Sequence, residues 1–174
     1  MRRTTHSGEV NFVTLTVVDW LDVFTRKTYK DFLVQCLQHC QKSKGLEIFA
    51  YVIMTNHLHL VVRDTSAPLS DVLRDFKTYT SKELVKMIGQ DPQESREEWM
   101  LPIFYERGQA NPLNTHHKFW KNENYQVALP TNEMLLQKVN YIHENPVRAG
   151  FVNEPHEWYY SSAHLLSPVR VMTA

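Results

Sequence analysis

Alternating hydrophobic and polar positions mark the extended parts of this chain. Residues 10–18 alternate two sets of side chains and are rich in β-branched residues, which predicts a strand. Residues 46–63 are unusually apolar and are interrupted only by Thr55 and Asn56, so they predict two strands joined by a tight turn. Residues 125–129 predict a further short strand.

Three other segments carry apolar residues at helical spacing. The first spans residues 29–41 and is followed by Gly45, a common helix stop. The second spans residues 69–88, and the third runs from a cap at residue 131 or 132 to Pro146, which is expected to end it. We therefore expect an α/β (α+β) fold, with a central antiparallel sheet and helices packed on it.

Residues 89–115 interrupt this regularity. They contain two glycines and three prolines and show little sustained periodicity, so a loop-rich excursion is expected there. The whole chain, residues 1–174, has the length of one domain, which is typically about 100–200 residues.

Composition narrows the class of protein. Lysine plus arginine equals aspartate plus glutamate at 19 each, so any nucleic-acid site must be local. No apolar run approaches the roughly 18–20 residues that cross a bilayer, so no membrane partner is expected. Cys36 and Cys40 lie four residues apart on one face of a predicted helix, and because the sequence has no other cysteine, core packing is favoured over zinc binding. Two cysteines are too few for a disulfide scaffold, so the protein is expected to be cytoplasmic.

The sequence Asn-His-Leu-His-Leu at residues 56–60 is the sharpest local feature. On a strand, alternate side chains share a face, so His57 and His59 project together while Leu58 and Leu60 enter the core on the other side. Two imidazoles so placed can chelate one cation, but a catalytic site usually needs a third protein ligand.

The end of the last predicted helix carries a second feature. Tyr141 and Asn145 are four residues apart, so a helix presents both on one face. The helix thus offers a hydroxyl and an amide to the same site. Because Asn145 precedes a proline, a helix C-cap is the alternative interpretation of that residue.

Together these motifs resemble the single-tyrosine HUH transposases, and most closely the REP-associated tyrosine transposases. The resemblance rests on Tyr-Val-Ile-Met-Thr-Asn-His-Leu-His-Leu-Val-Val at 51–62, Tyr-Ile-His-Glu-Asn-Pro-Val-Arg-Ala-Gly at 141–150, and a tail with Trp158, Ser161 and Ser162. It spans residues 8–163. One departure is Thr55, where the family often has proline, which is expected to loosen the turn.

The resemblance implies a ferredoxin-like HUH nuclease fold and a specific chemistry. His57, His59 and Asn145 would bind a divalent cation, Mg or Mn, and Tyr141 would be the nucleophile. The tyrosine would cleave and rejoin single-stranded DNA at hairpin-flanked targets through a 5′-phosphotyrosine intermediate. Such a protein would act as a monomer or homodimer in the cytoplasm of a prokaryotic cell, at the nucleoid when bound to DNA.

Basic and aromatic residues before and after position 115 are candidates for DNA contact. The alternatives are a solvated basic turn and, for Lys77, a solvated helix face. The candidates are Arg107, His116, His117, Lys118, Trp120, Lys121 and Lys77.

Three rival functions remain open at this stage. A noncatalytic, domesticated hairpin-binding protein of the same fold would bind DNA without a covalent product. A histidine-triad-like nucleotide hydrolase would need a third histidine where Val61 stands. A globular domain in which the histidines and the tyrosine are all structural would have a thermal stability that manganese does not change.

Overall fold

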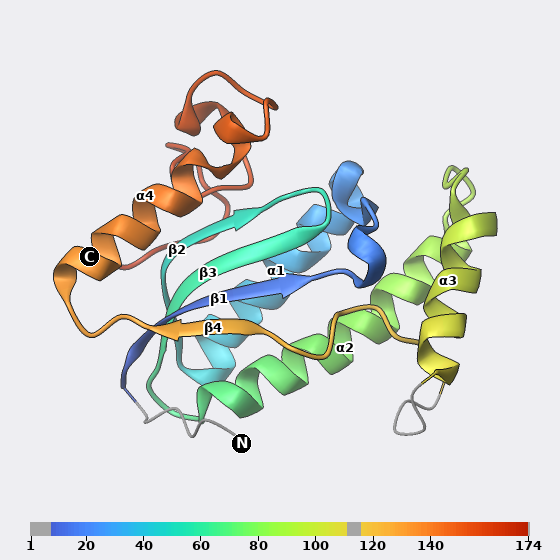
Figure 1. The fold of residues 1–174 in the computed structure, drawn as a ribbon, viewed down its shortest axis with the longest axis horizontal. Coiled ribbons are helices and arrows are strands. Elements are labelled where there is room, and N and C mark those ends of the chain that lie inside the picture. Colours follow the sequence, from blue (N-terminus) through green and yellow to red (C-terminus); the bar gives the residue numbers. More distant parts are fainter. Residues whose placement is uncertain (1–7, 111–115, 174) are drawn as a thin grey trace.

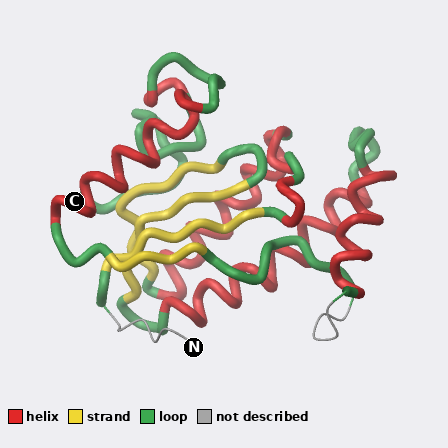
Figure 2. The backbone as a smooth tube through the Cα atoms, in the orientation of Figure 1, coloured by secondary structure: helices red, strands yellow, loops and turns green. Residues whose placement is uncertain are grey.

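A four-stranded antiparallel sheet forms the centre of the structure, a computed structural model that describes residues 8–110 and 116–173. The strands are β1 (Val10–Thr16), β2 (Leu46–Ile53), β3 (His57–Asp64) and β4 (Tyr125–Ala128). They lie side by side in the order β2-β3-β1-β4 (Figure 2). The predicted strands are all present, and β2 and β3 form the expected hairpin, in which the Met54 amide donates to the His57 carbonyl.

Helices cover both faces of this sheet (Figure 1). The helices are α1 (Lys27–Lys44), α2 (Leu69–Gln90), α3 (Glu97–Gln109) and α4 (Asn132–Arg148), with short 3-10 turns at Val18–Trp20, Val23–Thr25 and Pro155–Glu157. Helices α1 and α2 cover one face and α4 the other, while α3 packs against α2. Without α3, the order of elements and of strands is that of a ferredoxin-like β-α-β-β-α-β unit followed by α4. The predicted α+β class is confirmed, and no helix in the described part of the chain is long and apolar enough to cross a membrane.

The side chains on the two faces of β3 pack into two different cores. Leu58, Leu60 and Val62 enter the larger core, which α1 and α2 cover, as the alternation predicts. His59 and Val61 face the opposite side, where α4 packs on a smaller core. The buried Val61 occupies the place where a histidine-triad protein would need its third histidine.

Cys36 and Cys40 pack in the larger core, as predicted for the stripe of α1. Both are free thiols, and burial raises the pKa of Cys40 to about 11. They are therefore inert apolar side chains near neutral pH.

The prediction of a loop-rich excursion over residues 89–115 is wrong for most of its length. Helix α2 continues through Gly89, and α3 follows after a short connection. Met100, Phe104 and Gly108 recur every four residues and are buried, so packing outweighs the proline at 102. Residues 111–115 lie outside the described residues.

A glycine at position 108 lets the chain return over α3. A Cβ there would lie 2.5 Å from the Cα of His117, too close for any other residue. The Lys118 amide donates to the Phe104 carbonyl at 2.9 Å, which fixes the returning segment on the helix.

Helix α4 also differs from its predicted end. Pro146 lies inside its last turn, and the helix continues to Arg148 because the Ala149 amide still donates to the Asn145 carbonyl. Asn145 therefore has helical neighbours on both sides, and the C-cap interpretation is wrong. The N-terminal cap is Thr131, whose hydroxyl accepts from the Met134 amide.

The C-terminal tail covers the outer edge of β2. The Trp158 indole donates to the Ile53 carbonyl, and the Ser162 and Met172 amides donate to the Tyr51 and Ile48 carbonyls. These bonds satisfy strand groups that would otherwise face solvent at a sheet edge.

Candidate active site

Two histidines on β3 meet at the face that α4 covers. The rings of His57 and His59 have centroids 4.6 Å apart. His59 is buried and His57 is half-buried. Their alternate positions on one strand bring the two rings together, as the sequence predicts.

Helix α4 of the same chain brings Tyr141 and Asn145 to these histidines. The Tyr141 ring lies 5.5 Å from the His59 ring, and the side chain remains 37% exposed. Burial lowers the pKa of His57, and the nearby Asn145 side chain opposes this shift. One face of one helix thus presents a hydroxyl and an amide to the pair of imidazoles.

Hydrogen bonds to Nδ1 orient both imidazoles. Asn56 accepts from His57 Nδ1 at 2.7 Å, and Thr14, directly opposite His59 on β1, bonds its Nδ1 at 2.8 Å. The Asn56 amide nitrogen donates to the Asp22 carboxylate at 2.9 Å, so its oxygen must face His57. His57 Nδ1 therefore carries the proton, and its Nε2 keeps a lone pair for a ligand bond.

The electrostatics keep both rings neutral. Burial lowers the pKa of His59 to about 3, and the charges of Lys138 and Arg148, and of His57 when it is protonated, act in the same direction. The pKa of His57 is also lowered. Neutral imidazoles can bind a cation without first losing a proton.

The donor set fits a divalent cation. Among the described residues, no group of three histidine, cysteine, aspartate or glutamate side chains gathers to hold a metal. The candidate ligands are the two imidazoles and the Asn145 amide. These three ligands carry no charge, so a cation held by His57, His59 and Asn145 keeps its full charge for an anionic substrate.

Two cations border the Tyr141 ring. The Arg148 guanidinium lies 4.4 Å and the Lys138 ammonium 5.3 Å from its centroid. Sequence reasoning missed both, although Lys138 is three positions before Tyr141 and so on its face of the helix. They add positive charge beside the hydroxyl-bearing ring.

The turn before His57 is tied to the segment after β1. Thr55 Oγ1 donates to Asp22 Oδ1 at 2.6 Å, beside the bond from Asn56. Thr55 thus anchors the turn, contrary to the expectation that it loosens it. Arg96 in turn donates to the Asp22 carbonyl at 2.6 Å.

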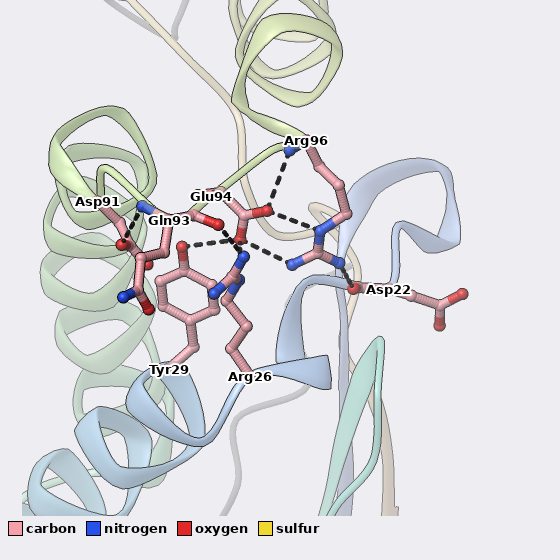
Figure 3. Close-up of polar contacts among 7 residues, drawn as sticks. All are labelled: Asp22, Arg26, Tyr29, Asp91, Gln93, Glu94 and Arg96. Carbon is pink, nitrogen blue, oxygen red and sulfur yellow. Dashed lines mark hydrogen bonds and ion pairs between the residues drawn. The ribbon is translucent and has the colours of Figure 1, made fainter.

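A buried carboxylate holds Arg96 in place (Figure 3). Glu94 accepts from Arg96, from the Tyr29 hydroxyl at 3.0 Å, and pairs with Arg26 at 3.1 Å. Hydrogen bonds from Arg96 chiefly hold the pKa of Glu94 down, at about 2. We call Arg26, Tyr29, Glu94 and Arg96 the Glu94 cluster.

Two of the predicted DNA contacts have structural positions instead. Trp120 is buried, and its indole donates to Thr80 Oγ1 at 2.9 Å, so it cannot stack on a base. The Lys77 ammonium donates to the carbonyls of Lys121 and Asn122 and to Asn124 Oδ1. It holds the loop before β4, and burial lowers its pKa to about 8.

The remaining DNA-contact candidates lie nearer the surface. His116 is exposed, His117 and Lys118 are half-buried, and the two histidines line a hollow between α2 and α3. Arg107 is exposed and pairs with Asp19 at 2.8 Å. The Lys121 ammonium lies over the ring of Trp20, and the roles of these five residues stay predictions.

One solved structure supports this architecture. A REP-associated tyrosine transposase bound to a REP hairpin is 18% identical over 93% of this chain and 81% of its own, with a TM-score of 0.66. A candidate transposase from Deinococcus radiodurans R1 is 14% identical over 83% of this chain and 97% of its own, with a TM-score of 0.47. No curated protein matches.

A family model gives the assignment. The model described as "Transposase IS200 like" matches residues 13–108, more than half of the chain. This range contains both histidines and ends before α4. With the sheet and helix arrangement shared with the REP-associated transposase, it follows that the chain belongs to the IS200-like transposase family.

Proposed function

We propose that this transposase cleaves and rejoins single-stranded DNA through a covalent link to Tyr141. The observation that carries the proposal is the packing of the Tyr141 ring 5.5 Å from His59, within one chain and beside His57 and Asn145. A nucleophile and three neutral cation ligands then share one site. His57, His59 and Asn145 are the proposed ligands and Tyr141 the proposed nucleophile.

The proposed cleavage exchanges one phosphoester for another. The Tyr141 phenol oxygen bonds to the phosphorus, and the bond from phosphorus to the 3′ oxygen breaks. The phenol loses its proton to solvent, and the departing oxygen gains one to become a 3′-hydroxyl. The 5′ end stays on the protein, and attack by a 3′-hydroxyl reverses the reaction, so no nucleotide cofactor is required.

The chain's own residues prepare this reaction. Asn56 and Thr14 orient the two imidazoles, and burial keeps them neutral. Lys138 and Arg148 place positive charge beside the Tyr141 ring, where a phosphodiester would lie. A bound Mg or Mn ion would supply Lewis-acid stabilisation of the charge that develops on the phosphate oxygens.

Hairpin-containing single-stranded DNA is the proposed substrate. Support comes from the REP-associated transposase of similar fold, which was solved bound to a REP hairpin. The proposal extends that partner to this chain as a class of DNA structure.

A covalent-trapping experiment tests the proposal. A library of 3′-labelled hairpin oligonucleotides is incubated with the protein and manganese and run on a denaturing gel, because the proposed adduct retains the 3′ fragment. We expect a protein-linked band that is lost in Tyr141→Phe and with chelator. Tyr125→Phe, an exposed tyrosine on β4, is the matched control and should retain the band.

Two results would contradict the proposal. Hairpin binding without any adduct would favour the noncatalytic binder. An adduct that persists in Tyr141→Phe would assign the nucleophile elsewhere.

A further inference from the structure

Trp20 presents an exposed aromatic surface beside the candidate active site. Its side chain is 55% exposed, and its ring centroid lies 6.0 Å from that of His57 at an interplanar angle of 75°. Neither the fold nor the proposed cleavage step uses this ring. An exposed tryptophan next to a proposed metal ligand therefore calls for a role of its own.

The backbone at Trp20 is in an unfavourable conformation. Asp19 and Trp20 have φ values of 52° and 56°, in the left-handed region that side-chain-bearing residues rarely adopt. Such residues persist only where their surroundings hold them, and they gather at ligand sites. The left-handed pair turns the chain so that Trp20 lies outside the core into which Val17 and Val18 pack.

Contacts from three directions hold this segment, residues 18–22, which we call the Trp20 loop. Asn56 Nδ2 lies 3.4 Å from the Trp20 carbonyl, which ties the loop to the turn before His57. Arg107 pairs with Asp19 and Arg96 donates to the Asp22 carbonyl. Arg96 is the N-cap of α3 and Arg107 lies in its last turn. The two ends of α3 therefore contact the Trp20 loop near its two ends.

The surroundings of the ring suit nucleic acid better than protein. The Lys121 ammonium lies 4.3 Å from the ring centroid, so a cation and an aromatic surface stand together. The neighbouring Asp19 is also exposed, so charged residues border the aromatic surface, unlike the broad apolar patches that bind proteins. An aromatic platform with a neighbouring cation is the combination that binds single-stranded nucleic acid.

We propose that Trp20 stacks on a base of the single-stranded DNA next to the cleaved phosphodiester, while Lys121 contacts a neighbouring phosphate. This inference rests on the proposed function and adds a substrate-binding group to it. Because every base offers a π-face, the contact fixes the position of the strand and discriminates little among base types. Stacking beside His57 would place the adjoining phosphodiester near Tyr141.

Equilibrium binding tests the inference without chemistry. Binding of fluorescent hairpin DNA with a single-stranded flank is measured by anisotropy, in Tyr141→Phe protein and in chelator, so that neither cleavage nor metal binding contributes. Trp20→Asn removes the ring and suits the left-handed backbone, and Trp20→Tyr keeps a ring. Trp99→Asn on α3 is the control, because Trp99 is 47% exposed.

We expect Trp20→Asn to weaken binding about tenfold, Trp20→Tyr to restore most of it, and Trp99→Asn to have no effect. An abasic scan of the DNA should find one position where base removal weakens the parent but has no added effect in Trp20→Asn. That position names the stacked base.

Unchanged affinity of Trp20→Asn, additive losses at every abasic position, or no binding of single-stranded DNA by the parent would overturn the inference. The stacking inference and the proposed cleavage reaction can fail independently of each other. An adduct at Tyr141 together with no effect of Trp20→Asn on binding would support the cleavage reaction and contradict base stacking on Trp20. Weaker binding by Trp20→Asn with no adduct would support base stacking on Trp20 and contradict the cleavage reaction.

Discussion

Trp20 and Trp120 lie in adjacent segments at the His57 end of the sheet, yet one side chain is exposed and the other is buried. The Val18 amide donates to the Phe119 carbonyl, so the two segments touch. Trp120 is 4% exposed and closes the core, whereas Trp20 is 55% exposed. Residue type and neighbourhood are shared, and only the course of the backbone differs.

Backbone conformation decides which aromatic is available to a ligand. Trp120 lies opposite Val17 in an antiparallel bridge, which places its indole toward Thr80 on α2. Trp20 follows a left-handed residue and is itself left-handed, which directs it away from that core. The aromatic surface beside His57 therefore comes from the Trp20 loop. Four changes probe how that loop and the core around Trp120 are held.

Truncation of Trp120 should have the largest effect, on stability. Trp120→Ala removes a buried indole and leaves Thr80 without its donor, so we expect the free energy of unfolding to fall by about 3–5 kcal/mol. Urea denaturation measures it, with Trp99→Ala as the exposed control. A stable Trp120→Ala protein that no longer binds DNA would reverse the assignment of the two tryptophans.

The Glu94 cluster should make stability depend on acid pH. Hydrogen bonds from Arg96 depress the pKa of Glu94 from 4.5 to about 2, so its stabilisation is fully present above about pH 5 and is lost as pH falls toward 2. We expect up to about 3 kcal/mol of the free energy of unfolding to disappear over this range. Urea midpoints at pH 7 and pH 3 measure the loss.

Glu94→Gln should remove most of that pH dependence, while Glu98→Gln, an exposed neighbour on α3, should leave it intact. Equal acid sensitivity in both variants would mean that the carboxylate does not anchor the Trp20 loop through Arg96.

Loss of the Asn56 amide should weaken metal binding. Asn56→Ala removes the hydrogen bond to His57 Nδ1, so the imidazole can rotate and change tautomer. Loss of a residue that hydrogen-bonds a metal-binding histidine typically lowers metal affinity about 10–100-fold. Manganese titration followed by electron paramagnetic resonance measures the affinity. Asn153→Ala, exposed in the tail, serves as the control; equal affinity in the two variants would show that Asn56 does not orient the ligand.

The smallest effect is expected at Arg107. Its ion pair with Asp19 is exposed and screened by solvent, so Arg107→Ala should lower the melting temperature only slightly. Thermal melting measures this, and added salt should narrow the difference from wild type. A large drop in melting temperature would mean that the contact between α3 and the Trp20 loop is far stronger than an exposed ion pair allows.

The sheet and the histidine face were predictable because period and register are local properties of sequence. Alternation places His57 and His59 together, and helical spacing does the same for Tyr141 and Asn145. The prediction over residues 97–109 is wrong because Pro102 and Gly108 are typical of loops, whereas burial of Met100 and Phe104 stabilises a helix there.

Other features depend on tertiary contacts that spacing does not encode. Nothing in the sequence distinguishes the exposed Trp20 from the buried Trp120, since a left-handed backbone pair at Asp19 carries no glycine signal. The basic and aromatic residues on either side of position 115 predict a DNA-facing surface, but Trp120 among them is buried. Lys77 on α2 likewise donates to loop carbonyls. The orientation of His57 by Asp22 through Asn56 likewise joins residues far apart in the chain.

The single turn between Tyr141 and Asn145 makes α4 sensitive to length as well as to residue identity. A substitution in this turn alters one side chain, whereas one inserted or deleted residue rotates the rest of the helix by about 100°. Such a change would separate the proposed nucleophile from the proposed ligand and would move Arg148 with it. Across descendants of this gene, the count of residues between the two positions should therefore tolerate less change than the residues themselves.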